Sequence, residues 1–86
     1  MSALKTHERT NAKNGFSVTP DDSNDISNVS NGIYLGGEGD LQVTLENMED
    51  EESITFTGMK SGIFYPLRVK RVWATNTTAT DIIAVY

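Results

Sequence analysis

Apolar and polar residues alternate along two segments in the middle of the chain, residues 41–45 (LQVTL) and 54–57 (ITFT). A period of two places successive side chains on opposite faces, which is typical of a strand with one apolar and one solvated face. Between the two segments lies ENMEDEE, residues 46–52, with five carboxylates in seven positions. The pattern therefore predicts a β-hairpin whose acidic tip is a solvated loop.

Shorter apolar runs precede this hairpin and are bounded by turn-forming residues. Residues 16–19 (FSVT) end at Pro20, and the DDSND that follows favours turns through side-chain hydrogen bonds to the backbone. Residues 33–35 (IYL) follow an Asn-Gly pair at 31–32 and precede two glycines at 36–37. Each run predicts a short strand, and the second strand is expected to end at the two glycines.

Three of the seven basic residues, Arg68, Lys70 and Arg71, lie in residues 66–75 (PLRVKRVWAT), inside an otherwise apolar pattern. The proline suits the start of a strand, where its missing amide proton costs no ladder bond. Strict alternation from residue 67 to residue 75 then places Arg71 in the row of apolar residues that faces the core. The segment predicts a strand, but a guanidinium in the core row needs an explanation.

A β-bulge near Lys70 and Arg71 explains it, because the extra residue of a bulge changes the side on which the later residues point. Val72 and Ala74 would then turn inward, and both bases would be released from the core row. Without a bulge, Arg71 has to pair with a carboxylate. The three basic residues are expected either to pair with carboxylates across an interface or to lie on a solvated face.

Residues 82–86 (IIAVY) are apolar at both odd and even positions. A continuous apolar run is expected of a strand that is covered on both sides. In so small a domain one side is the domain's own core. We expect the other side to contact a neighbouring subunit.

Residues 1–15 differ from the rest of the chain, because they carry Lys5, Arg9 and Lys13 against a single glutamate. They are expected to form either a disordered terminus or a basic arm that becomes ordered on a partner. Together with the strands, this predicts an all-β protein. The expected architecture is a small antiparallel β-sandwich or partly open barrel over residues 16–86, with an extended N-terminal arm.

Length and composition favour an assembly. A chain of 86 residues forms one domain and buries only about 60–65% of the surface that its unfolded form exposes. Domains with such thin cores usually recruit disulfides, metals or further subunits. The sequence has no cysteine, and its single histidine, His7, lies in the polar N-terminal segment. We therefore expect a homo-oligomer, with no metal and no cofactor.

Charge and hydropathy argue against two kinds of partner. The net charge of −5 opposes general nucleic-acid binding, because the phosphate backbone attracts proteins that present positive charge. No apolar run approaches the ~20 residues of a membrane-spanning helix, and residues 1–16 lack the apolar middle of a secretory signal. We expect a protein that is made in the cytosol and has no membrane partner.

No combination of residues predicts catalysis or a metal site. Nucleophilic catalysis needs a base beside the nucleophile, and the chain offers one histidine and no cysteine. The carboxylates of Asp21, Asp22 and residues 46–52 lie in predicted loops, with no apolar pocket to raise a pKa. The acidic run also lacks the spaced ligands and the glycine of calcium-binding loops. We expect these carboxylates to form turns and to be solvated.

The aromatic residues leave two alternative functions open. Trp73 lies close to the three basic residues in the sequence, and bases of single-stranded nucleic acid stack on exposed rings near basic groups. A single-stranded nucleic-acid-binding β-barrel is therefore one alternative. A carbohydrate-binding module is another, favoured if Tyr34, Tyr65 or Trp73 is exposed.

Three segments, FSVTPDDSND, GIYLGGEGDLQVTL and PLRVKRVWATNTTATDIIAVY, carry a resemblance to a known family. In order and spacing, residues 16–86 resemble the spike base proteins of tailed phages and gene transfer agents. Two departures stand out. The family often has a short loop where this chain has the acidic residues 46–52, and Asn76 stands where the pattern has glycine. Asparagine also adopts left-handed turns, so the second departure is compatible with the fold.

The resemblance implies a non-enzymatic virion protein that is assembled in the host cytoplasm. Such a protein is a self-associating β domain that anchors or connects a spike or fibre, or a neighbouring capsid or tail protein, on the particle. A capsid decoration (cement) protein and a tail adaptor are alternatives within the same class. The N-terminal segment is expected to reach an acidic or polar neighbouring surface, and Arg68, Lys70 and Arg71 to form a charged interface. The apolar residues predicted to build the core and the subunit contact are Leu67, Val69, Trp73, Ile82, Ile83, Val85 and Tyr86.

Overall fold

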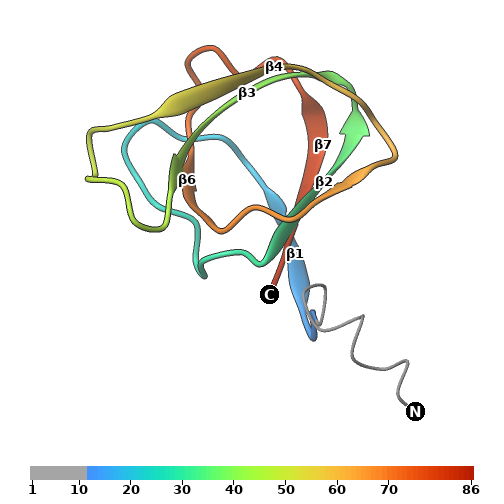
Figure 1. The fold of residues 1–86 in the computed structure, drawn as a ribbon, viewed down its shortest axis with the longest axis horizontal. Coiled ribbons are helices and arrows are strands. Elements are labelled where there is room, and N and C mark those ends of the chain that lie inside the picture. Colours follow the sequence, from blue (N-terminus) through green and yellow to red (C-terminus); the bar gives the residue numbers. More distant parts are fainter. Residues whose placement is uncertain (1–11) are drawn as a thin grey trace.

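A computed structural model describes residues 12–86, so the predicted arm residues Lys5 and Arg9 lie outside the described part of the chain. Every element within this range is a strand, and the strands form a single small body (Figure 1). They are β1 (Gly15–Val18), β2 (Gly32–Gly37), β3 (Gly39–Leu45), β4 (Ile54–Met59), β5 (Phe64–Tyr65), β6 (Val69–Val72) and β7 (Thr80–Val85).

The strands form two antiparallel sheets that face each other. The four-stranded sheet has the order β1-β7-β2-β5, and the three-stranded sheet has the order β4-β3-β6. The pairing of β3 with β4 is the hairpin predicted from the alternating pattern, with Leu41 opposite Phe56 and Val43 opposite Ile54. The sheets do not close on each other, so the predicted all-β, small sandwich-like fold is confirmed (Figure 1).

The core lies between the two sheets and is built from alternate residues of the central strands. The inward side of β7 contributes Ile82 and Ala84, while the residues between them point to the other face. The largest fully buried hydrophobic side chains of the core are Ile33, Leu35, Leu41, Val43, Val69 and Val72. This is the arrangement expected from the period-two pattern.

Strand β3 is buried on both faces, whereas its sequence predicts one solvated face. Gln42 is 9% exposed and Thr44 is completely buried. The indole Nε1 of Trp73 donates a hydrogen bond to Thr44 Oγ1 at 2.9 Å, and Thr44 Oγ1 donates to the Glu52 carbonyl at 2.6 Å. The side-chain amide nitrogen Nε2 of Gln42 donates to Ser53 Oγ at 2.9 Å. The prediction was wrong because residues of the hairpin loop and of the segment after β6 cover this face.

Strand β2 includes the two glycines that were expected to end it and ends at the second of them, Gly37. The chain passes from the four-stranded to the three-stranded sheet immediately afterwards, at Gly39. A Cβ atom at Gly39 would lie 2.6 Å from the Ala79 backbone nitrogen, which is closer than real Cβ contacts allow. A glycine is therefore needed at this crossing, where two backbone segments approach each other.

The strand predicted over residues 67–75 is shorter in the structure. Strand β5 belongs to the four-stranded sheet and β6 to the three-stranded one, so the chain changes sheets between Tyr65 and Val69, at Pro66. Beyond β6, the carboxylate of Asp22 accepts hydrogen bonds from the Ala74 and Thr75 amides at 2.8 and 3.0 Å. Ala74 is exposed, contrary to the prediction, because this side-chain contact ends the strand before it.

The turn after β6 accounts for one departure from the family pattern. Asn76 has a φ of 62°, the left-handed conformation that asparagine tolerates. Its side-chain amide also donates to Gln42 Oε1 at 2.9 Å, a bond that glycine has no group to make. Asparagine therefore supplies both the backbone conformation and part of the cover over β3.

Candidate functional site

The basic segment of β6 contains the predicted bulge. A single step along β3, from Thr44 to Leu45, corresponds to two steps along β6, from Arg71 to Val69. Lys70 is therefore the extra residue, and the prediction of a bulge near Lys70 and Arg71 is confirmed. The bulge removes both basic side chains from the row that faces the core.

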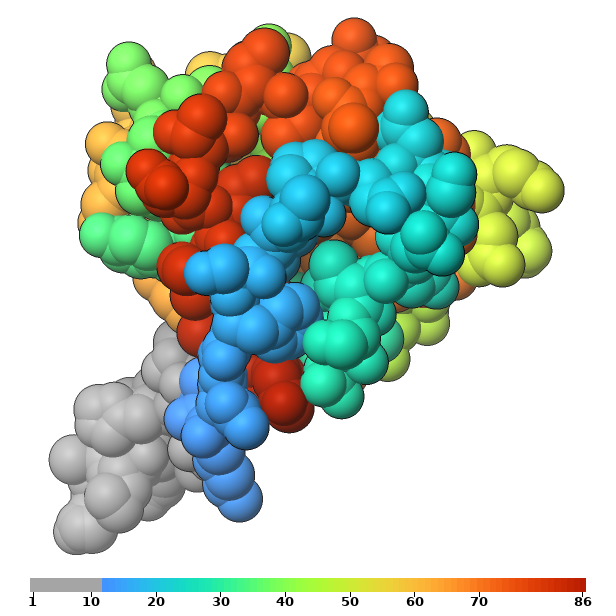
Figure 2. Space-filling view, turned by 180° about the vertical axis from the view of Figure 1, so that it is seen from behind, coloured from blue at the N-terminus to red at the C-terminus, as the bar shows by residue number. Residues whose placement is uncertain are grey.

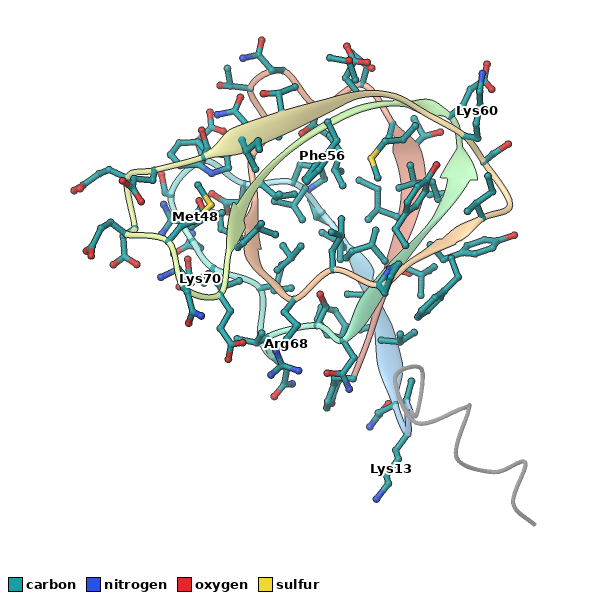
Figure 3. The ribbon with its side chains drawn as sticks, in the orientation of Figure 1. Lys13, Met48, Phe56, Lys60, Arg68 and Lys70 are labelled. Atoms are coloured by element: carbon teal, nitrogen blue, oxygen red, sulfur yellow. The ribbon has the colours of Figure 1, made fainter. Side chains whose placement is uncertain are left out.

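Each basic side chain of this segment pairs with a carboxylate of the same chain. The distances are 2.6 Å from Arg68 Nε to Glu46 Oε1, 3.1 Å from Lys70 Nζ to Asp50 Oδ1, and 2.8 Å from Arg71 Nε to Asp25 Oδ1. Arg68 and Lys70 lie on the side of the molecule that carries the acidic tip (Figure 3). The bulge thus releases both bases from the core row, but it does not leave them unpaired, because nearby loops supply carboxylates of the same chain. A contact of these bases with a neighbouring subunit stays a prediction.

Arg68 joins three segments of the chain. Besides its bond to Glu46, the guanidinium donates to Asn31 Oδ1 at 2.6 Å, and the Arg68 carbonyl accepts from the Glu46 amide at 2.8 Å. Hydrogen bonding to Arg68 holds the pKa of the Glu46 carboxyl below its ordinary value and raises the pKa of Arg68. The pair is therefore ionised at neutral pH and connects the acidic tip to β6.

Arg71 and Trp73 form a packed cluster with the loop before β2. The Arg71 guanidinium lies 5.4 Å from the centroid of the Trp73 ring, within the range of a cation–π interaction. The Arg71 side chain is only 16% exposed. The indole nitrogen is engaged with Thr44, and the ring is half-buried. These contacts make Trp73 a packing residue of the domain and weaken its candidacy as a base-stacking ring.

The loop between β1 and β2, residues 19–31, covers the outer edge of β6. Its amides donate to β6 carbonyls at three points: Asp21 to Val72 at 2.8 Å, Ile26 to Lys70 at 3.0 Å, and Ser30 to Val69 at 3.0 Å. The Ser30 hydroxyl is fully buried; it donates to the Leu67 carbonyl at 2.7 Å and accepts from the Val69 amide at 2.9 Å. The edge of β6 is thus hydrogen-bonded within the chain.

Two aspartates hold this loop in place. Besides the amides of the turn after β6, Asp22 accepts a hydrogen bond from Thr75 Oγ1 at 2.7 Å. The Thr75 amide and hydroxyl lower the pKa of Asp22, while the Ser23 amide and the Asn24 side chain lower the pKa of Asp21. Both carboxylates are therefore ionised at neutral pH, and their role here is to order the loop.

The apolar residues predicted from the sequence divide between the core and the opposite face of the sheet. Val69 and Ile82 are buried in the core, and Leu67 packs against it. Ile83 and Val85 are half-buried and lie on the other face of β7. Their predicted contact with a second subunit stays a prediction. The Tyr86 ring packs edge-on against Phe16, with 5.9 Å between the ring centroids.

The outer face of the four-stranded sheet gathers further apolar side chains. Tyr34 lies opposite both Ile83 and Phe64, and it is 41% exposed. The Phe64 ring covers Gly32 so closely that a Cβ atom there has no room. Sequence reasoning did not group Tyr34 with Ile83. The alternation in β2 does indicate that Tyr34 points to the opposite face from its buried neighbours Ile33 and Leu35. The pairing of β2 with β7, which places Tyr34 beside Ile83, cannot be inferred from the sequence.

An open groove of about 260 Å³ lies between β1 and the loop that follows it. Residues 16–19 form one wall, and Asp21 with residues 24–27 forms the other. Figure 2 shows β1 in blue and the loop in cyan on the same face of the molecule. The groove thus runs along a sheet edge and has Asp21 and Asp25 among its lining residues.

The structure offers little for metal chemistry in the part of the chain that it describes. Across residues 12–86, no three histidine, aspartate or glutamate side chains converge as metal ligands would. A helix long and apolar enough to span a bilayer does not occur in that same range. The carboxylates discussed above instead accept hydrogen bonds from the backbone or pair with arginine and lysine.

Comparison with known proteins adds one informative similarity. No known protein family and no curated protein matched the chain by sequence. Among solved structures, the fold matches a chain in the structure described as "Capsid of native GTA particle computed with C5 symmetry", where GTA denotes a gene transfer agent. The TM-score is 0.75 at 28% sequence identity, and the match covers 87% of this chain and 83% of the other. The similarity to this chain of a gene transfer agent capsid structure thus covers nearly the whole domain.

Proposed function

We propose that this protein is a non-enzymatic structural protein of a phage-like virion. The observation that carries the proposal is the similarity to a chain of the gene transfer agent capsid, at 28% identity over 87% of this chain. It agrees with the resemblance of residues 16–86 to spike base proteins. The proposed role is that of a self-associating β domain that anchors a spike or fibre, or connects a neighbouring capsid or tail protein.

The surface of the domain supports an assembly role. Tyr34 and Ile83 lie side by side on the outer face of the four-stranded sheet, and Ile54 and Ile63 are 43% and 45% exposed. Exposed apolar groups of this kind are commonly covered by partners in assemblies. The basic residues of β6, in contrast, are already paired within the chain, so they stabilise the domain that presents these surfaces.

Mass spectrometry of purified particles tests the proposal. Particles from a producing strain are separated on a density gradient after nuclease treatment, and the peptides of this chain are quantified against those of the major capsid protein. We expect the chain to co-migrate with particles at a constant ratio across the peak. Its absence from particles, with all of it in the soluble fraction, would overturn the proposal.

Particles made without the protein separate the specific roles. Loss of a fibre from otherwise intact particles is expected for a spike or fibre anchor. Capsids that break at low ionic strength indicate a cement protein, and full heads without tails indicate a tail adaptor. Electron micrographs of the particles, with the intact gene restored as a control, distinguish these outcomes.

A further inference from the structure

Two sheet edges flank the loop of residues 19–31, and only one of them is closed by it. The edge of β6 accepts three backbone hydrogen bonds from this loop. The other edge belongs to β1, which is the outermost strand of the four-stranded sheet and pairs only with β7 in the described residues.

The direction of the free hydrogen-bonding groups on β1 follows from its pairing. Asn14 and Tyr86 exchange both backbone hydrogen bonds, at 2.9 Å each. In an antiparallel pair the hydrogen-bonded positions alternate, so Phe16 points its amide toward β7 while Gly15 and Ser17 point theirs away. The Gly15 amide is satisfied by Asn14 Oδ1 at 2.8 Å. Within residues 12–86, the Ser17 amide has no acceptor.

This free edge lies along the groove formed with the following loop. Asp21 and Asp25 belong to the far wall of this groove, and the Asp25 carboxylate pairs with Arg71 of β6. Acidic groups beside an open strand edge suit an extended basic peptide, because main-chain bonds add the strand and the charges orient it. The feature therefore calls for a partner strand with positive side chains.

The residues that precede the described part have the sequence of a candidate for this partner, since they include Lys5 and Arg9. Residues 1–11 reach about 36 Å when extended, far longer than β1. In an extended strand, Lys5, His7 and Arg9 share one face because they are two residues apart. The charge of this segment is thus complementary to the acidic wall of the groove.

The same copy is a poor source for this strand. Lys13 and Asn14 both donate to the Tyr86 carbonyl, so the chain is still aligned with the sheet two residues after the described part begins. Lys13 lies at the tip that points away from the two sheets (Figure 3). To return along β1, the chain would need a tight hairpin within Thr10-Asn11-Ala12, which lacks the glycine that such turns favour.

We propose that residues 1–11 of one copy add as a strand to the free edge of β1 in a neighbouring copy, with Lys5 and Arg9 facing Asp21 and Asp25. The inference rests on the self-association in the proposed function and names the surface that mediates it. The contact links each copy to the next through an extended arm, the head-to-tail type of interface that builds rings or chains of subunits.

Ser17→Pro tests the strand contact in the full-length protein. Proline removes only the outward amide of an edge strand and leaves the β1–β7 bonds in place. Sedimentation velocity is expected to show that Ser17→Pro weakens self-association roughly tenfold or more, whereas Ser17→Ala, which keeps the amide, leaves it unchanged. An unchanged circular dichroism spectrum excludes unfolding as the cause. Equal self-association of the two variants overturns the inference.

Disulfide trapping identifies the copy that supplies the strand, and the absence of native cysteine keeps the assay simple. A His7→Cys variant is mixed with a Ser27→Cys variant under mild oxidation, and we expect a covalent heterodimer on a non-reducing gel. A crosslink only within a single chain that carries both substitutions assigns the strand to the same copy and overturns the inference. No crosslink in either format also overturns it.

The proposed virion role is tested separately. Particles that incorporate Ser17→Pro at the normal ratio, together with unaltered sedimentation, would reject the arm contact and retain the virion role. A protein that crosslinks as expected but is absent from particles would retain the contact and reject the role.

Discussion

The edges of β6 and β1 lie on either side of one loop and differ in how their backbone groups are used. Three carbonyls of β6 accept amide hydrogen bonds from residues 19–31, and the buried Ser30 hydroxyl bonds to both Leu67 and Val69. On β1, the outward amide of Ser17 has no acceptor within residues 12–86. One edge is completed within the chain, and the other is left open beside a groove.

The two edges differ because the charged residues near β6 hold loops of the same chain against it. Arg68, just before β6, and Lys70 and Arg71 within it all pair with carboxylates of the same chain, and these pairs bring the acidic tip and the loop against the strand. An exposed strand edge is a site for pairing with another chain, and proteins usually cover such edges. This chain covers the β6 edge with the loop of residues 19–31, and it leaves the β1 edge on the other side of that loop uncovered in the described residues.

Among substitutions that test how the β6 edge is closed, Ser30→Ala is expected to have the largest effect on stability. The substitution leaves the buried Val69 amide and Leu67 carbonyl without the hydroxyl they now contact, and it should reduce the free energy of unfolding by about 1–3 kcal/mol. Urea unfolding followed by the fluorescence of the single tryptophan measures the change. Ser27→Ala, at an exposed position of the same loop, is the control. Equal stability of the two variants would show that the loop does not close β6 in this way.

A smaller, pH-dependent effect is expected from Asp22→Asn. The folded-state pKa of Asp22 lies below its ordinary value of 3.8, so its stabilising contribution is complete above that value and is lost as the pH falls through the folded pKa. The melting temperature of the wild type should therefore decline more steeply below about pH 4 than that of the variant. Glu51→Gln, in the acidic tip, provides the control. Parallel melting curves for wild type and Asp22→Asn would contradict the proposed anchoring of the loop.

The smallest effects are expected from the ion pairs. Arg71→Met removes a pair and a contact with Trp73 from a side chain that is only 16% exposed, and we expect a loss of about 1 kcal/mol. Arg68→Met removes a pair whose arginine is 56% exposed, and we expect a smaller loss. Measuring the free energy of unfolding of both variants in low and in high salt distinguishes the two ion pairs. The loss caused by Arg68→Met should shrink more in high salt, because salt screens the exposed pair more strongly. A larger effect at Arg68 would mean that the acidic tip, rather than the loop, holds β6.

Local patterns predicted much of the fold. The alternation in residues 41–45 and 54–57 predicted the β3–β4 hairpin, and the misplaced charge of Arg71 predicted the bulge at Lys70. These succeed because strand periodicity and bulges act between residues that are close in sequence or directly paired. The solvated face expected for β3 failed, because Trp73 and Asn76 reach it from a segment more than 28 residues away.

The candidate site was predicted only in part. The sequence identified Arg68, Lys70 and Arg71 as an unusual group, but it did not reveal that Glu46, Asp50 and Asp25 are their partners. Tyr34 was not grouped with Ile83, since that neighbourhood depends on the placement of β7 between β1 and β2. Side-chain partners across sheets depend on strand order, which local patterns do not encode.

By itself, the sequence determined the class of the domain, the β3–β4 hairpin, the bulge in β6 and the basic character of residues 1–15. These properties follow from the chemistry and spacing of neighbouring residues. Only the tertiary structure decided that the basic residues of β6 pair within the chain, and that β1, rather than β6, presents an open edge. That outcome depends on where the loop of residues 19–31 lies. The position of the loop is set by hydrogen bonds to residues that are distant in sequence: Ser30 bonds to Leu67, 37 residues away, and Asp22 bonds to Thr75, 53 residues away.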